Sequence, residues 1–545
     1  MRYAEEKRIR PDILTSVVYW AIILMMLYSI ISVRIFGNMG AGFSALPLAL
    51  YYVLYISFVL AVQKSVYIMV RLRARRSQFL NAETNMQKSM RIFVLAGIAL
   101  AIIIALTSFV FSTSVIGTGK VYFEFIITAV SLLFLCPQGV IRGYLQGLGY
   151  TKPIMIADLL VSAISFVSGG VISIILFEYG KKVNNLFHGD EYSAIYGASG
   201  MMIGLMIGSI AGLIQILISF KLRSKDIEEI VKSGAPRYLD NKNDVLTGIR
   251  PILYMYASPI LMCFGDNIFF NLAQIKKDNA VEMISLYGAF NGRVTCLVVL
   301  ISFLCCIPFI KSWNRVMARI ERDELEGARD RFRKLKHSML MLLIPVSIGF
   351  FVSSVIIEQM IFGKNSEYLE GIFPLGSVMI FLFSVGVFAS WLLNHMGKNI
   401  LVVVGITVSW GIHVIAFILF VYVLDMKILG MALSQIIAFA VFSFMSMFLI
   451  FKMLKVRYEF LKNAGIPLIS SGIAGLILYA ENRIFLNIIG EVLTFVIGVV
   501  IYIVVYMLLM VLLRGVRTHE LKNIPLGGLL TSFSAKVQHD RFYEE

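Results

Sequence analysis

The sequence predicts an all-α, polytopic membrane protein of about fourteen transmembrane helices, arranged as two parallel-repeat six-helix bundles plus two C-terminal helices. The first observation is composition: 59% of the 545 residues are hydrophobic and 15% are charged, against about 45–50% and about 25% in soluble domains. The second is that long apolar stretches recur along the whole chain, each able to cross roughly 30 Å of hydrocarbon as a helix. The third is the alternation of basic and non-basic loops between them.

The apolar stretches define the expected spans in order. The first is too long for a cleavable signal peptide and lacks a small-x-small cleavage site, so we expect a retained helix. Six spans form the first bundle, six the second, and two follow; the thirteenth is the shortest and ends in AENRI. The expected spans are 13–33, 43–70, 92–111, 122–145, 154–177, 195–220, 249–274, 284–310, 338–357, 372–393, 400–423, 428–451, 466–479 and 488–513.

Basic residues orient these spans. With the N-terminus inside, the inner segments carry MRYAEEKRIR, RLRARR, KLRSK, the run 315–336 and KMLKVRYEFLK, whereas the outer loops hold only scattered bases. The positive-inside rule therefore predicts a multi-pass protein of the cell (cytoplasmic) membrane with both termini cytoplasmic. The net charge of +16 follows from this topology and from attraction to anionic lipids of the membrane. It does not indicate nucleic-acid binding, because the bases are dispersed without interleaved aromatic residues.

The same pattern sets the domain boundaries that we expect. Residues 1–220 form the N-terminal bundle, 221–248 a cytoplasmic linker, 249–451 the C-terminal bundle, 452–513 the additional pair and 514–545 a cytoplasmic tail. No loop is long enough for a catalytic domain, and 311–337 is typical of a charged amphipathic helix. The five cysteines lie in predicted helices without metal-ligand spacing to histidine. We therefore expect no enzyme activity, metal or cofactor.

A partial internal repeat supports the two-bundle arrangement. GVIRGYLQGLGYTKP at 139–153 and GVFASWLLNHMGKN at 386–399 occupy matching places, six spans apart. An even number of spans preserves orientation, so the halves are parallel repeats, and a substrate path is expected between them near mid-membrane. Arg142, Gly143 and Gly147 belong either to a packing turn or to a gating hinge, with Arg142 expected at the level of anionic headgroups.

Several short motifs resemble one family. RGYLQGLGYTKP (142–153), RIFG (34–37) and YGASG (196–200) resemble motifs of the multidrug/oligosaccharidyl-lipid/polysaccharide (MOP) flippase superfamily. The chain looks most like its polysaccharide-transporter and stage V sporulation protein B-like branch, related to lipid II flippases. The resemblance implies a transporter that flips a lipid-linked (polyprenyl-diphosphate) oligosaccharide or cell-wall precursor by alternating access, with glycan-assembly enzymes as partners. Unlike lipid II flippases, the chain has no arginine in the stretch AIILMMLYS (21–29), which puts lipid II itself in doubt.

Ionisable residues inside predicted spans are functional candidates, because each costs about 2.5–3.5 kcal/mol on insertion scales. Arg293 and Lys64 are the candidate substrate-binding cations. Asp266 and Arg293 lie about eight residues from the outer ends of adjacent helices, so we expect them at similar depth and able to pair. Arg293 either serves as a structural partner of Asp266 or binds phosphate, whose oxygens its planar fork matches. Lys64 either snorkels to the inner headgroups or lies on a cavity floor.

Asp266, Asn267 and His413 are the candidate ion-coupling residues. His413 is the one titratable side chain among these whose ordinary pKa lies near neutrality, so it either couples transport to protons or packs as a neutral histidine. Asp266 with Asn267 is the candidate site for H⁺ or Na⁺. Two other functions remain open. One is a cation-coupled multidrug antiporter, for which Asp266 and Asp158 are the acidic candidates; the other is a membrane-embedded glycan-assembly enzyme or scaffold.

Overall fold

The computed structural model describes residues 11–235, 244–274, 280–363, 366–369, 371–456 and 461–516, and every regular element among them is helical. Thirteen of these helices are long and apolar enough to cross a membrane. The first runs from Ile13 to Arg75 over 63 residues, long enough for two crossings. The prediction of an all-α polytopic protein with about fourteen spans is therefore confirmed.

Gly37 separates the first two predicted spans. α1 (Pro11–Tyr55) contains this residue in a non-helical conformation with φ of 73°, which glycine adopts far more readily than residues with a Cβ. The kink coincides with the last residue of the RIFG motif. The chain then continues through a π-helical turn, η1 (Ile56–Ala61), into α2 (Val62–Arg75).

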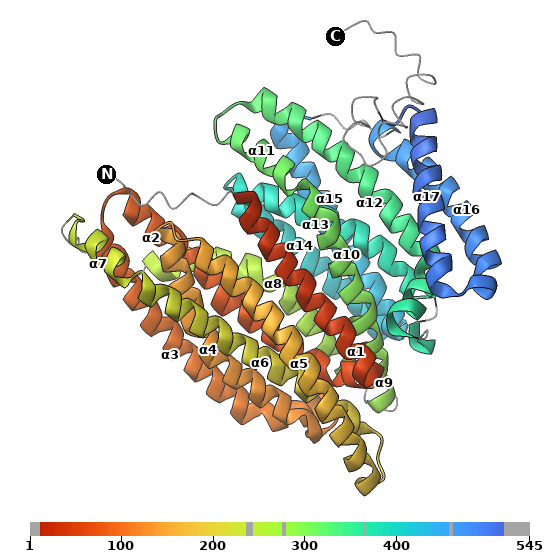
Figure 1. The fold of residues 1–545 in the computed structure, drawn as a ribbon, viewed down its shortest axis with the longest axis horizontal. Helices are drawn as coiled ribbons and strands as arrows, with labels where there is room; N and C mark the ends of the chain where they lie inside the picture. Colours follow the sequence, from red (N-terminus) through yellow and green to blue (C-terminus); the bar gives the residue numbers. More distant parts are fainter. Residues whose placement is uncertain are drawn as a thin grey trace, which may run out of the picture. The chain divides into compact units, whose positions relative to one another are not determined.

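The next helices pack closely beside this element in the first of two compact units, which comprises residues 1–307 and 393–442. α4 contacts α2, α3 and α6, while α1 packs on α5 and α6 (Figure 1). Gly200 and Gly204 of α6 lie against the backbone of α5, because small residues let membrane helices approach closely. The helices are α3 (Phe79–Phe111), α4 (Tyr122–Gly147), α5 (Lys152–Phe187), α6 (Glu191–Leu222) and the short α7 (Ser224–Lys232).

Helices from the second half of the sequence complete this unit. α1 contacts α8 (Asp244–Gln274), α9 (Ala280–Ala289) and α10 (Cys296–Cys306). A Cβ on Gly288 of α9 would meet the backbone of Asn38 and Gly42 on α1, so these two backbones touch. α8 also contacts α14 (Asn399–Phe417).

The second compact unit comprises residues 308–392 and 443–545. α12 packs on α16 and α17, and the hydroxyls of Tyr502 and Tyr506 donate to the α12 carbonyls of Pro345 and Met341 at 2.9 and 2.8 Å. α13 and α15 each contribute residues to both units. The predicted boundary between repeats stays a prediction. The helices are α11 (Ile310–Ile320), α12 (Leu325–Phe362), α13 (Gly376–His395), α15 (Lys427–Leu454), α16 (Ile466–Ile489) and α17 (Glu491–Leu512).

Two expected elements differ from the structure. The segment 311–337 is two helices, because the chain turns between α11 and α12 at Asp323, whose φ is 58°. The thirteenth span does not end at 479: α16 continues to Ile489, with Glu481 and Asn482 buried against its neighbours. The polar AENRI sequence suggested a helix end, but α16 continues through it and keeps burying one face.

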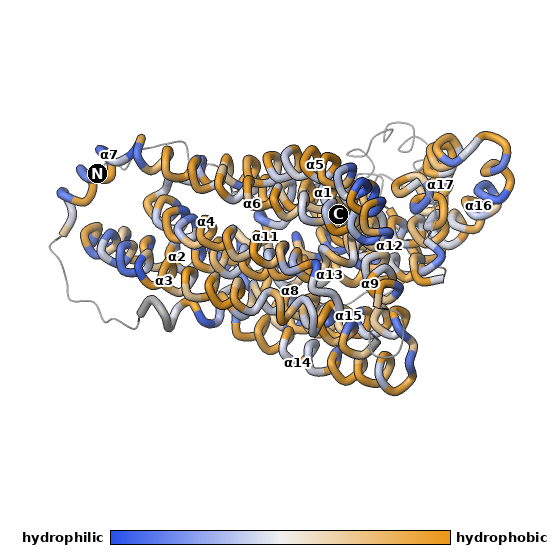
Figure 2. The backbone as a smooth tube through the Cα atoms, turned by 90° about the horizontal axis from the view of Figure 1, so that it is seen from below, coloured by the Kyte–Doolittle hydropathy of each residue, from blue (hydrophilic) through white to orange (hydrophobic). Residues whose placement is uncertain are grey.

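Hydropathy follows the helices as a membrane protein requires. Figure 2 shows hydrophobic residues along the lengths of the helices, with many of the hydrophilic ones near helix ends and on α7. Many large apolar side chains are exposed along α3 and α17, for example Leu106 at 77% and Val492 at 59%. Faces of this kind are stable in contact with hydrocarbon rather than water.

Candidate functional site

Asp266 on α8 is the centre of a buried polar cluster formed by three helices. The ring nitrogen Nε2 of His413, on α14, lies 2.7 Å from its Oδ1. The amide Nε2 of Gln435, on α15, donates to its Oδ2 at 2.8 Å. All three residues are at most 4% exposed. Two predicted ion-coupling residues, Asp266 and His413, are therefore in direct contact.

The helices around this cluster are fixed by further hydrogen bonds. The hydroxyl of Ser409, one turn before His413, donates to the carbonyl of Ala438 on α15 at 2.7 Å. Tyr254 and Thr407 join α8 to α14 at 2.8 Å. These contacts hold α14 between its two neighbours, so His413 faces Asp266 in a defined geometry. Gln435, which carries no charge, was not identified from the sequence.

Asn267 lies beside Asp266 but makes a different contact. Its Oδ1 accepts from Nδ2 of Asn271, one helical turn later, at 2.8 Å. Both side chains are buried, with Asn267 1% exposed. Its own Nδ2 reaches no hydrogen-bond partner among the described residues. The structure thus places an amide pair next to the Asp266 cluster, and a role of Asn267 in ion binding stays a prediction.

Arg293 does not pair with Asp266, so that expectation is wrong. Both oxygens of Asp266 are bonded to His413 and Gln435, whereas Nε of Arg293 donates to Oδ1 of Asn38 on α1 at 2.9 Å. Arg293 is 5% exposed and lies on a π-helical turn, η4 (Phe290–Thr295). Turns of this kind insert one extra residue and are frequent at functional sites.

Lys64 on α2 is half-buried. Its ammonium lies 5.6 Å from the centre of the Tyr67 ring on the same helix face, a distance at which a cation is attracted to an aromatic face. The choice between a headgroup contact and a cavity floor stays a prediction. Arg293 and Lys64 belong to different helices.

Arg142 is buried inside the helical bundle. Its Nη2 forms an ion pair with Oδ1 of Asp158 on α5, and Tyr55 interacts with the same guanidinium. The Arg142 side chain is 0% exposed and that of Asp158 is 7% exposed. Burial excludes direct contact with headgroups, because the guanidinium points inward to a carboxylate across the turn, and the level of Arg142 in the membrane stays a prediction. A gating role for Arg142 stays a prediction.

Gly143 and Gly147 form the contact between α4 and α2. A Cβ on Gly143 would lie 2.6 Å from the carbonyl oxygen of Gln63, and one on Gly147 would lie 2.5 Å from Val70. Gln63 and Gln146 also join the helices by an amide hydrogen bond of 2.9 Å. This contact fits the packing turn predicted from the sequence, and a hinge role stays a prediction.

Replacing Gly143 by alanine should therefore lower the free energy of unfolding by about 1–3 kcal/mol, because the added methyl group overpacks α4 against α2. The measurement is thermal unfolding of the purified protein in detergent. Gly411→Ala is the matched control, since nothing lies within 4 Å of the Cβ there, and it should be neutral or slightly stabilising. Equal losses in both variants would contradict the packing role of Gly143.

The described residues offer no group of three or more metal-ligating His, Cys, Asp or Glu side chains. All five cysteines are present as free thiols, and four of them are buried. The Asp266 cluster differs from a metal centre, because both carboxylate oxygens already meet nitrogen groups.

Three solved structures are similar to this chain over most of its length. "Lipid II flippase MurJ, inward closed conformation" covers 91% of this chain and 97% of its own, at a TM-score of 0.62 and 15% identity. An inward-facing multidrug resistance MATE family transporter of the MOP superfamily covers 81% of this chain and 99% of its own, at a TM-score of 0.60 and 13% identity. The eukaryotic MATE transporter AtDTX14 covers 84% of this chain and 97% of its own, at a TM-score of 0.53 and 14% identity.

No protein-family model matches the sequence, and no curated protein sequence is significantly similar to it. The likeness is therefore one of fold, spread over nearly the whole length of each solved structure. It confirms the fold that the sequence motifs implied. This chain has the fold that the lipid II flippase shares with the MATE transporters of the MOP superfamily.

Proposed function

We propose that this protein is a membrane transporter that flips a lipid-linked (polyprenyl-diphosphate) saccharide precursor across the cell membrane by alternating access. The observation that carries the proposal is the buried guanidinium of Arg293 on the π-helical turn η4. It donates a hydrogen bond to Asn38, the residue after the kink of α1 at Gly37. A planar fork of N–H donors suits diphosphate oxygens. The fold is the one found in the solved lipid II flippase.

The separation of Arg293 from Asp266 supports distinct roles for the two groups. The carboxylate that was expected to neutralise Arg293 is instead bonded to His413 and Gln435. Binding of an anionic substrate at Arg293 then requires no release of Asp266. We propose Asp266, Asn267 and His413 as the ion-coupling group, with H⁺ or Na⁺ as the ion, and Lys64 as a second cation for the headgroup.

A second candidate is a cation-coupled antiporter of organic cations. The buried carboxyl of Asp266 and the fold likeness to MATE transporters favour it. Such an antiporter would recognise cations through acidic groups, whereas the flippase recognises an anion through Arg293. The two candidates therefore predict opposite charge preference, and a glycan-assembly enzyme or scaffold would show no leaflet exchange on its own.

The test is leaflet exchange of a labelled polyprenyl-diphosphate sugar in vesicles that contain the purified protein. Arg293→Ala should slow exchange about 10- to 100-fold, because a charge-assisted hydrogen bond is worth about 1.5–3 kcal/mol. Arg293→Lys should recover part of it, since lysine keeps the charge but not the fork. Arg483→Ala is the control, because this exposed arginine bonds Tyr479 on its own helix.

The outcomes separate the candidates. Full exchange in Arg293→Ala would remove Arg293 from the substrate site. Absence of exchange in the wild-type vesicles, together with uptake of an organic cation, would replace the flippase by the antiporter. Absence of both transport activities would favour the enzyme or scaffold, which is then tested by adding glycan-assembly enzymes.

A further inference from the structure

Glu124 is a buried carboxyl near the start of α4. It is the third residue of that helix and 0% exposed. The hydroxyl of Ser199 on α6 is the polar group that faces it. Neither carboxyl oxygen reaches a partner at full hydrogen-bond geometry among the described residues. The group is therefore enclosed without an ion pair.

The surroundings of Glu124 are apolar. Val121, three residues before it, and Phe125, the next residue, belong to a buried cluster and are 0% and 1% exposed. Ala194 and Ile195 of α6, one turn before Ser199, belong to the same cluster. An ionised carboxylate in such surroundings is strongly disfavoured unless a cation neutralises it.

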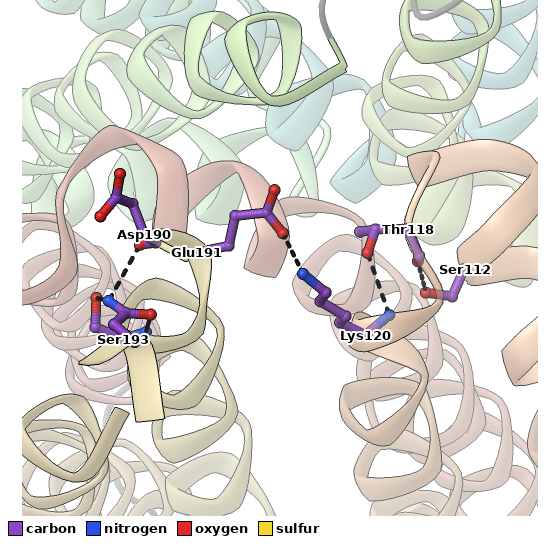
Figure 3. A network of polar contacts seen from close by, with 7 residues as sticks. Ser112, Thr118, Lys120, Asp190, Glu191 and Ser193 are labelled. Carbon is purple, nitrogen blue, oxygen red and sulfur yellow. Dashed lines mark hydrogen bonds and ion pairs between the residues drawn. The ribbon is translucent and has the colours of Figure 1, made fainter. Parts of the chain in front are cut away.

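The nearest lysine in the chain is already paired. Lys120, four residues before Glu124, contacts Glu191 of α6 at 2.8 Å and lies 4.5 Å above the Tyr192 ring. Figure 3 shows Lys120 and Glu191 reaching toward each other from the starts of α4 and α6, with Thr118 and Ser112 holding the turn. This ion pair links the turn before α4 to the start of α6, and Glu124 and Ser199 lie farther along these two helices.

Other charged groups on the helices that pack near Glu124 also have partners of their own. At this end of the unit, Glu178 and Lys181 of α5 pair with each other at 2.6 Å, and Arg34 of α1 has interactions of its own. Charged residues of α2 and α3 lie toward the opposite end of α4. Titratable groups of the neighbouring elements include Lys120, Glu191, Tyr192, Tyr196, Glu178, Lys181, Arg34, Lys64 and Glu83, and Asp266 on α8, whose Phe264 and Ile268 pack against the same apolar cluster.

We propose that Glu124, with Ser199, is a proton-binding site of the α4–α6 pair, separate from the Asp266 cluster. A metal cation is less suited, because the site offers only one carboxyl and one hydroxyl, while cations that prefer oxygen take about six or more ligands. The carbonyl oxygens of helix interiors are already bonded within the helix. A proton needs only the carboxyl itself, with Ser199 as its hydrogen-bond partner.

The test is infrared spectroscopy of the purified full-length protein in lipid, which resolves the C=O band of protonated carboxylic acids. At about pH 7, the wild type should show this band, and in Glu124→Gln its intensity should fall by the contribution of one protonated carboxyl group. Ser199→Ala should shift the band, because the hydroxyl that faces the acid is removed. Glu481→Gln, which removes another buried carboxyl without a partner among the described residues, should leave the Glu124 share intact.

A carbodiimide probe gives a second, independent readout. These reagents modify protonated carboxyls in apolar surroundings, so mass spectrometry should find Glu124 modified, less at about pH 9 than at about pH 6. Replacing sodium by choline should change nothing. An unchanged infrared band in Glu124→Gln, or protection by sodium alone, would overturn the proposal. Neither readout involves transport, so its failure is distinguishable from failure of the flippase proposal.

Discussion

Replacing Asp158 by alanine should lower the free energy of unfolding by about 3–5 kcal/mol, because it leaves a fully buried guanidinium without its carboxylate. The Arg142 side chain has no exposed surface, so water cannot take over the role of Asp158. Nε and Nη1 of Arg142 already lack partners at full hydrogen-bond geometry among the described residues. The ion pair with Asp158 is therefore the main contact that compensates this charge.

A double variant distinguishes charge from packing. Arg142→Met combined with Asp158→Leu removes both charges and fills similar volume, so it should recover most of the lost stability. Glu178→Ala is the matched control for an exposed ion pair: Lys181 and Glu178 are 51% and 61% exposed, and the expected change is about 0–1 kcal/mol. The measurement is thermal unfolding in detergent.

Equal destabilisation of Asp158→Ala and the double variant would show that lost packing, rather than an uncompensated charge, is responsible. The same series also tests gating. If the Arg142–Asp158 pair opens during transport, the double variant should be stable yet alter the rate of leaflet exchange. A stable double variant with unchanged exchange would leave Arg142 as a structural residue.

The sequence could not reveal this pair for a geometric reason. Arg142 lies five residues before the end of α4, a position at which a long basic side chain normally extends to the headgroups. Here α5 begins at Lys152 and returns alongside, which brings Asp158 to the same level sixteen residues later. The fold and the approximate number of spans follow from hydropathy, whereas the direction of a side chain depends on its neighbours.

The Asp266 cluster shows the same limit. Similar depth along two helices indicated that Asp266 and Arg293 could pair, but depth carries no information on which way each side chain faces. The π-helical turn η4 inserts a residue and changes that direction for Arg293. Gln435 gave no signal, because an uncharged amide is not exceptional in a predicted span. His413 and Asp266 were each recognisable as buried ionisable groups, and only the structure joined them.

The ion-coupling proposal makes the second large prediction. Asp266→Asn keeps the size of the side chain and removes its charge, so leaflet exchange should continue but stop responding to an imposed ion gradient. In the wild type, one coupled charge moving through about 100 mV contributes about 2.3 kcal/mol, or roughly a 50-fold change in the leaflet distribution of substrate. In Asp266→Asn this ratio should fall to about 1. His413→Gln should abolish a proton-driven response.

Comparing Asp266→Asn with His413→Gln identifies the ion that drives transport, because His413 contacts one oxygen of Asp266 and Gln435 contacts the other. If protons drive transport, His413→Gln and Asp266→Asn lose the response together, and replacing sodium has no effect. If sodium drives it, His413→Gln keeps the response and Asn267→Ala loses it. Ser409→Ala is the control, since it breaks only the bond between α14 and α15 and leaves both contacts of Asp266 in place. A wild-type distribution that ignores both gradients would remove Asp266 from coupling and leave the cluster as a structural contact among three helices.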